Sequence, residues 1–67
     1  MTRDYLIKRL ELTNGAVLEM VTDLPETWED RNQKELVESV EYILLNAHSQ
    51  IEEKIAEYRL KTALDSE

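Results

Sequence analysis

Residues 28–64 read WEDRNQKELVESVEYILLNAHSQIEEKIAEYRLKTAL and contain neither proline nor glycine. Their apolar members are spaced by one, three and four positions, which predicts one long amphipathic helix. At about 100° per residue these side chains fall within an arc of roughly 120°, the width of a buried helix face. The residues of this main stripe are Leu36, Val37, Val40, Ile43, Leu44, Ala47, Ile51, Ile55 and Tyr58.

A thinner apolar stripe lies on the opposite side of the same helix. Its members are Tyr42, Leu45, Ala56, Leu60 and Ala63, and Ser49 interrupts it. A helix that is apolar on two sides usually has two neighbours, so the sequence predicts more than one packing partner for it.

Residues 2–24 predict a shorter helix, although one dipeptide argues against it. Thr2 is a suitable N-cap, and Asp4 suits the first turn. The apolar residues that share one face are Leu6, Ile7, Leu10, Val17, Met20, Val21 and Leu24. Asn14-Gly15 is the opposing signal, because glycine inside a helix costs about 1 kcal/mol relative to alanine and Asn-Gly is typical of β-hairpin turns. A β-hairpin turning there leaves neither strand face apolar. A continuous or kinked helix is therefore favoured over two short helices or a hairpin.

Pro25 separates the two helical segments, because proline disfavours helical geometry in the residue before it. The expected elements are a helix over about 3–24, a connection over 25–27 and a helix over about 28–64, with a frayed end after it. Thr27 is the expected N-cap of the second helix; a later start is the alternative, because Asn32 and Glu35 have capping-box spacing. A short connection makes the helices antiparallel neighbours. The predicted fold is a single all-α domain, an antiparallel helical hairpin over residues 1–67.

The predicted lengths of the two helices do not match. At 1.5 Å per residue they measure roughly 33 Å and 55 Å, so the first would end beside about residues 47–51 of the second. Apolar side chains beyond that point would have no cover within the chain, and a two-fold dimer would supply it as a four-helix bundle. The expected dimer interface consists of Ile51, Ile55, Tyr58, Leu60, Leu64, Tyr42 and Leu45.

The 67 residues carry 15 acidic and 8 basic side chains, a net charge of −7. Eight of the acids lie within residues 19–41 against only Arg31 and Lys34, a local net of −6. Such a surface repels nucleic acid and anionic lipid and favours a protein partner with a basic surface. The residues expected to bind this partner are Trp28, Glu26, Glu29, Asp30, Glu35 and Glu38. For Trp28 itself, packing over the corner between the helices is favoured over the role of a binding hot spot.

The sequence offers little chemistry for catalysis. It has no cysteine, and His48, the single histidine, has only Glu52 at ligand spacing, which is half of a metal site. His48 is therefore interpreted as a boundary residue of the main stripe. No serine has a suitable base, and one glycine cannot form a phosphate-binding loop. No enzyme activity, cofactor or metal is expected.

The expected function is that of a small protein-binding regulator, adaptor or inhibitor. The expected location is the cytoplasm, because the chain lacks cysteine, signal-peptide features and any apolar run longer than four residues. Accessory proteins of phages and mobile elements have this size and charge. One alternative is an antagonist whose carboxylates imitate phosphates; another is a structural subunit of a larger assembly. The expected partners are a second copy and a basic protein, without direct contact to nucleic acid or membrane.

Overall fold

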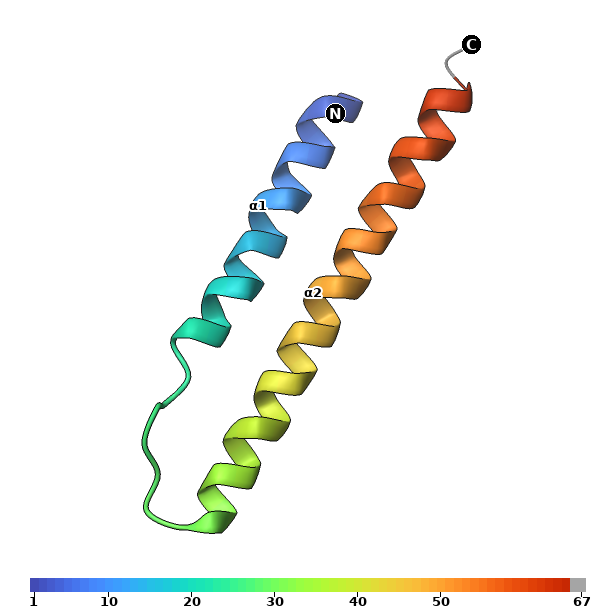
Figure 1. Cartoon of the computed structure of the whole chain (residues 1–67). Coiled ribbons are helices and arrows are strands. Elements are labelled where there is room, and N and C mark those ends of the chain that lie inside the picture. Colours follow the sequence, from blue (N-terminus) through green and yellow to red (C-terminus); the bar gives the residue numbers. More distant parts are fainter. Residues whose placement is uncertain (66–67) are drawn as a thin grey trace.

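The chain folds as two packed helices that run antiparallel to each other (Figure 1). The computed structural model describes residues 1–65, with side chains to residue 63. Helix α1 spans Arg3–Thr22 and helix α2 spans Arg31–Asp65; the described residues contain no strand. The predicted all-helical hairpin is thus confirmed for a single chain. No helix in this part of the chain is long and apolar enough to cross a membrane.

Helix α1 begins and ends for the reasons that its sequence indicates. The hydroxyl of Thr2 accepts a hydrogen bond from the backbone N–H of Tyr5 at 3.2 Å, which makes Thr2 the N-cap. At the other end the N–H of Asp23 donates to the carbonyl of Met20 at 3.2 Å, a tightened last turn. The chain leaves the helix there because the proline that follows restricts the residue before it.

Helix α1 continues through Asn14-Gly15 without a break. Neither of the alternatives, two short helices or a β-hairpin, is present. Gly15 has no positive φ, so the helical backbone at this position does not require glycine. The apolar face of α1 and its packing on α2 outweigh the cost of one glycine.

Replacing Gly15 with alanine is expected to stabilise the hairpin by about 0.5–1 kcal/mol. Apart from the adjoining residues and the backbone of its own helix turn, nothing lies within 4 Å of a Cβ atom at this position, so the change removes backbone freedom from the unfolded chain and adds no clash. Urea unfolding at one fixed protein concentration measures the effect. Ala16→Gly, at the exposed neighbouring position, should lower stability by a similar amount. A loss of stability in Gly15→Ala would show that another molecule packs closely on this residue.

The connection between the helices is longer than predicted, because α2 begins at Arg31 and not at Trp28. The carboxylate of Asp30 accepts the backbone N–H of Gln33 at 2.9 Å, and the Gln33 side chain accepts the N–H of Glu29 at 2.7 Å. This reciprocal arrangement resembles a capping box and fixes the start of the helix. Thr27 is therefore not the N-cap, and the spacing of Asp30 and Gln33 is the signal that identifies the true one.

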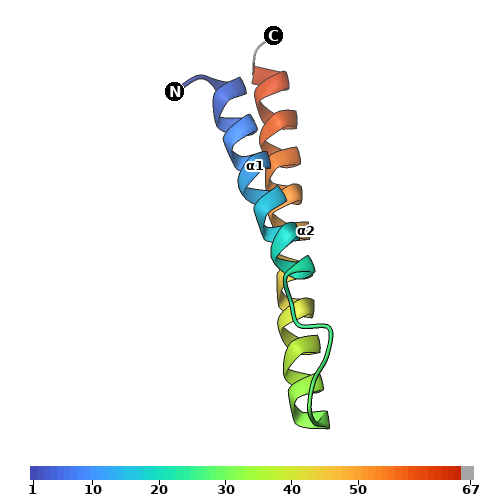
Figure 2. The same cartoon turned by 90° about the vertical axis from the view of Figure 1, so that its left-hand side faces the viewer.

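The longer connection changes which parts of the helices face each other. Leu24, Pro25 and Trp28 line one hollow together with Val37 and Glu41, so the connection runs alongside the first turns of α2 (Figure 2). Helix α1 consequently lies beside the later part of α2. Its start reaches the far end of α2, where the Arg3 guanidinium donates a hydrogen bond to the hydroxyl of Thr62.

The expected overhang at the end of α2 is therefore wrong for Ile51, Ile55 and Tyr58, whereas Leu60 does stay exposed. Glu11 of α1 forms an ion pair with Arg59, and Ile55 is buried. Ile51 and Tyr58 are half-buried on the same side. The prediction failed because it used a three-residue connection, with which α1 would pack against α2 from its first turn onward. The actual connection has eight residues, which lie along the first turns of α2 and shift α1 towards the end of that helix.

Two helices cannot enclose a core of normal size. The Cα trace measures 57 × 16 × 12 Å, and the buried hydrophobic residues within residues 1–63 are Ile7 and Ile55. Many large apolar side chains stay exposed; they are Met1, Tyr5, Leu10, Leu12, Leu18, Met20, Trp28, Leu36, Tyr42, Ile43, Leu45 and Leu60. The case for a partner thus depends on whole faces of the hairpin and not on one uncovered end.

Candidate interaction surfaces

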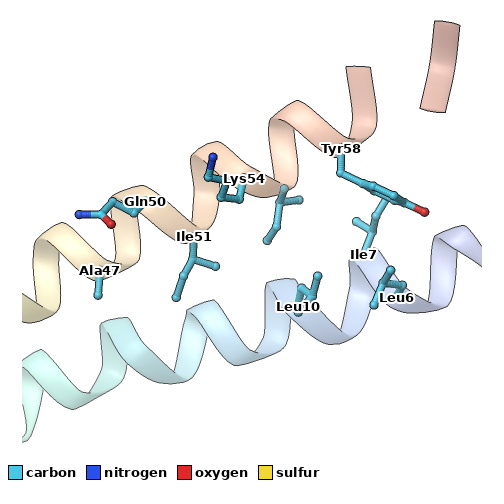
Figure 3. A pocket seen from close by; sticks show the side chains of 9 residues that line it. Leu6, Ile7, Leu10, Ala47, Gln50, Ile51, Lys54 and Tyr58 are labelled. Atoms are coloured by element: carbon cyan, nitrogen blue, oxygen red, sulfur yellow. The ribbon is translucent and has the colours of Figure 1, made fainter. Parts of the chain in front are cut away.

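A shallow apolar groove lies between the two helices near the chain termini (Figure 3). Leu6 and Leu10 point from α1 towards α2, and Ala47 and Ile51 point from α2 towards α1. The groove has a volume of about 490 Å³, and its complete lining is Leu6, Ile7, Leu10, Ala47, Gln50, Ile51, Lys54, Ile55 and Tyr58. Gln50 and Lys54 are the polar residues at its edge, apart from the Tyr58 hydroxyl. Because nearly all of the lining is apolar, the groove suits another apolar surface better than a polar ligand.

The groove is one end of a longer apolar face. On both helices its residues alternate in steps of four and three, the spacing of a coiled-coil seam. The seam of α1 consists of Leu6, Leu10, Thr13, Val17 and Met20, and the seam of α2 consists of Leu36, Val40, Ile43, Ala47, Gln50 and Lys54. We call these two seams the groove face. On α2 the groove face continues beyond the groove through the exposed Ile43 to Leu36, near the start of the helix.

The opposite face of the hairpin carries polar and charged contacts between the two helices. Here Glu11 and Arg59 form their ion pair across the two helices, and Glu52 lies 3.8 Å from the Nε2 atom of His48. The Nδ1–H of His48 donates to the backbone carbonyl of Asn14 at 3.2 Å. Asn14 is buried, and its Oδ1 atom has no hydrogen-bond partner among the described residues. This face therefore contrasts with the groove face in chemistry.

His48 acts as a boundary residue in the helix–helix contact. It is half-buried, and its ring joins α2 to the backbone of α1. Within residues 1–65 no three His, Cys, Asp or Glu side chains group as ligands for a metal ion. Its role visible in the structure is that of a polar link between the helices.

A second surface lies at the turn of the hairpin. Trp28 is 42% exposed, and it lines one hollow together with Glu26, Glu38 and Glu41. We call these four residues the acidic corner. The Lys34 ammonium lies 5.9 Å from the centroid of the indole ring, within the range of a cation–π contact, and 3.9 Å from the Glu38 carboxylate. Part of the tryptophan thus packs over the first turns of α2, and part stays accessible.

The residues predicted to bind a partner do not all belong to this corner. The structure brings Trp28, Glu26 and Glu38 together, whereas Asp30 is engaged in capping α2. Glu29 precedes that cap, and Glu35 is ion-paired with Arg31 at 3.3 Å. Glu41 was missed, although its three-residue spacing from Glu38 places both on one side of the helix.

The residues predicted for a dimer interface do not share one surface. Ile51, Ile55 and Tyr58 face α1 and line the groove. Tyr42 and Leu60 are exposed on the side of α2 that is turned away from α1, and we call them the back stripe, whereas Leu45, seven residues before Glu52, lies on the side of the Glu11–Arg59 ion pair. The side chain of Leu64 lies outside the described residues. The sequence prediction assigned Leu36, Leu10 and Ile43 to core faces, although their exposed side chains form part of the groove face.

Comparison with protein-family models, curated proteins and solved structures gives no match. The function has to be inferred from the two surfaces themselves.

Proposed function

We propose that this chain is a small acidic protein-binding module that acts in the cytoplasm as a regulator, adaptor or inhibitor by occupying a partner's surface. The observation that carries this proposal is the acidic corner, where an accessible tryptophan lines one hollow with Glu26, Glu38 and Glu41. Tryptophan is enriched among binding hot spots, and a surrounding excess of carboxylates favours encounter with a basic surface. The proposal assigns the chain no catalysis, cofactor or metal.

We also propose that the working unit is a homodimer in which two hairpins form a four-helix bundle. The small buried core supports this, because a chain of this size without a disulfide or metal normally needs an oligomer for stability. Two hairpins placed face to face cover one apolar face of each chain.

A second candidate function is antagonism of a nucleic-acid-binding protein, with carboxylates in the place of phosphates. The grouping of Glu26, Glu38 and Glu41 around one hollow favours it, since a phosphate mimic needs contiguous negative charge. Such an antagonist should lose affinity steeply with salt and compete with nucleic acid for its target. A third candidate, the structural subunit, would form assemblies larger than a dimer.

The experiment that tests the proposal is capture of a partner from extract of the source cell on the tagged chain, at low salt. We expect one protein with a basic surface to be retained and to elute at moderate salt. The matched variant Glu38→Gln/Glu41→Gln keeps the shape of the corner and removes two charges, so it should retain much less of that protein. Retention that does not differ between the two baits, or no specific retention, would contradict the role of the acidic corner.

A further inference from the structure

We propose that the groove face of one chain is covered by the groove face of a second copy, turned so that the two acidic corners lie at opposite ends of the dimer. This inference rests on the proposed homodimer and goes further by naming the buried surface and the relative orientation of the copies.

The amount of exposed surface fits a partner of this size. One chain exposes 5725 Å², whereas a compact monomer of 7.9 kDa is expected to expose roughly 4,400 Å². The excess is about 1,300 Å² per chain, and two copies together would bury about 2,600 Å² if it were removed. Obligate homodimers bury about 2,000–5,000 Å² in total, so one second copy accounts for the excess.

Burial of the groove face in a dimer can account for this excess exposed area. Both helices present regular seams on this face. Its two large apolar residues on α2 that are exposed in a single chain, Leu36 and Ile43, are 65% and 63% exposed. The opposite face carries the Glu11–Arg59 ion pair and Glu52, which would lose hydration on burial. The back stripe belongs to one helix alone and is interrupted by Ser49.

The distribution of charge selects the orientation. Residues 19–41, around the turn of the hairpin, carry a net charge of −6. Six of the eight basic residues lie outside that segment, in the helix portions nearer the termini; they are Arg3, Lys8, Arg9, Lys54, Arg59 and Lys61. Copies with their corners at the same end would bring two strongly negative segments together. The rest of the chain also carries seven acidic residues and so has a net charge of −1, and copies with their corners at opposite ends place each negative segment beside this nearly neutral end of the other copy.

This orientation brings like helices together. For two hairpins face to face with their corners at opposite ends, a two-fold axis places α2 against α2 and α1 against α1. The apolar residues of α2 on or beside this face run from Leu36 to Tyr58, so the axis passes near the midpoint, Ala47. Its small side chain permits close approach of the two α2 helices. The result is the four-helix bundle of the proposed function, with a defined register.

The face is tested by two matched substitutions on the same helix, Ile43→Glu and Leu60→Glu. Both side chains are similarly exposed in one chain, at 63% and 66%, so neither change should disturb an isolated hairpin. In sedimentation equilibrium we expect the Ile43→Glu variant to have lost the dimer and to be present as a monomer, either folded or poor in helix. The Leu60→Glu variant should remain a dimer. A dimer that survives Ile43→Glu and is lost in Leu60→Glu would overturn the groove face in favour of the back stripe.

The orientation is tested by disulfide formation, because the chain has no cysteine of its own. In the proposed arrangement the two copies of position 47 meet at the axis, so Ala47→Cys should cross-link two chains under mild oxidation. Leu36→Cys should not, since its copies would lie about 33 Å apart at 1.5 Å per residue from the axis. A wild-type dimer in which Ala47→Cys fails to cross-link would overturn the orientation. A monomeric wild type would overturn the homodimer itself.

Discussion

Ile55→Glu is expected to leave no stable hairpin. Ile55 is 8% exposed and lies between α2 and the start of α1, so the substitution removes a large aliphatic side chain and buries an unpaired carboxylate. Truncating a buried isoleucine alone costs about 2–5 kcal/mol. A domain of this length has a total stability of only about 3–10 kcal/mol. Circular dichroism should therefore show loss of most of the helical signal, with no cooperative thermal transition.

The control for this prediction is Leu60→Glu, five residues further along the same helix. Leu60 is exposed on the back stripe, so the new carboxylate remains hydrated and the helical signal should stay at the wild-type level. If Ile55→Glu were as helical and as stable as Leu60→Glu, the packing of α1 on this end of α2 would be wrong.

Trp28→Ala is expected to weaken binding of the captured partner at least tenfold, which corresponds to about 1.4 kcal/mol, while changing the melting temperature little. The indole is partly accessible within a ring of carboxylates, and its contact with Lys34 lies at the surface. Its burial against the first turns of α2 is incomplete, so its removal should cost the hairpin little. Isothermal titration with the purified partner and a thermal melt of the same samples measure the two effects.

The control is the substitution of another exposed apolar residue that lies outside the acidic corner. It shows whether the loss of affinity is specific to Trp28 or follows from any loss of exposed apolar surface. Leu12→Ala removes an exposed apolar side chain from α1 and should leave both affinity and melting temperature unchanged. The opposite pattern for Trp28→Ala, unchanged affinity with a clearly lowered melting temperature, would assign the tryptophan to corner packing alone.

The existence and type of both helices could be predicted from the sequence, because capping residues, proline and the spacing of apolar residues determine them locally. Thr2 caps α1, Pro25 separates the helices, and an uninterrupted amphipathic pattern carries α2 to its end. The start of α2 was placed too early because Thr27 and Asp30 both suit an N-cap, and the reciprocal bonding of Asp30 with Gln33 decides between them. An error of three residues there changed the connection and with it the overlap of the helices.

The interaction surfaces were harder to predict because they depend on that overlap. Ile51 and Ile55 were expected to be uncovered, yet they contact α1 once the connection covers the first turns of α2. Ile43 belongs to the main stripe in sequence but remains exposed, since one helix covers only part of a stripe about 120° wide. Spacing alone identifies the stripe, whereas the position of α1 determines which of its edges stays open.

Sedimentation equilibrium of the purified wild-type chain tests the central claim, that a second copy is needed to bury the groove face. We expect a mass of twice 7.9 kDa, with dissociation on dilution accompanied by a fall in thermal stability. A chain that remains at 7.9 kDa over the whole concentration range, with full helical content and a cooperative melt independent of concentration, would contradict the account.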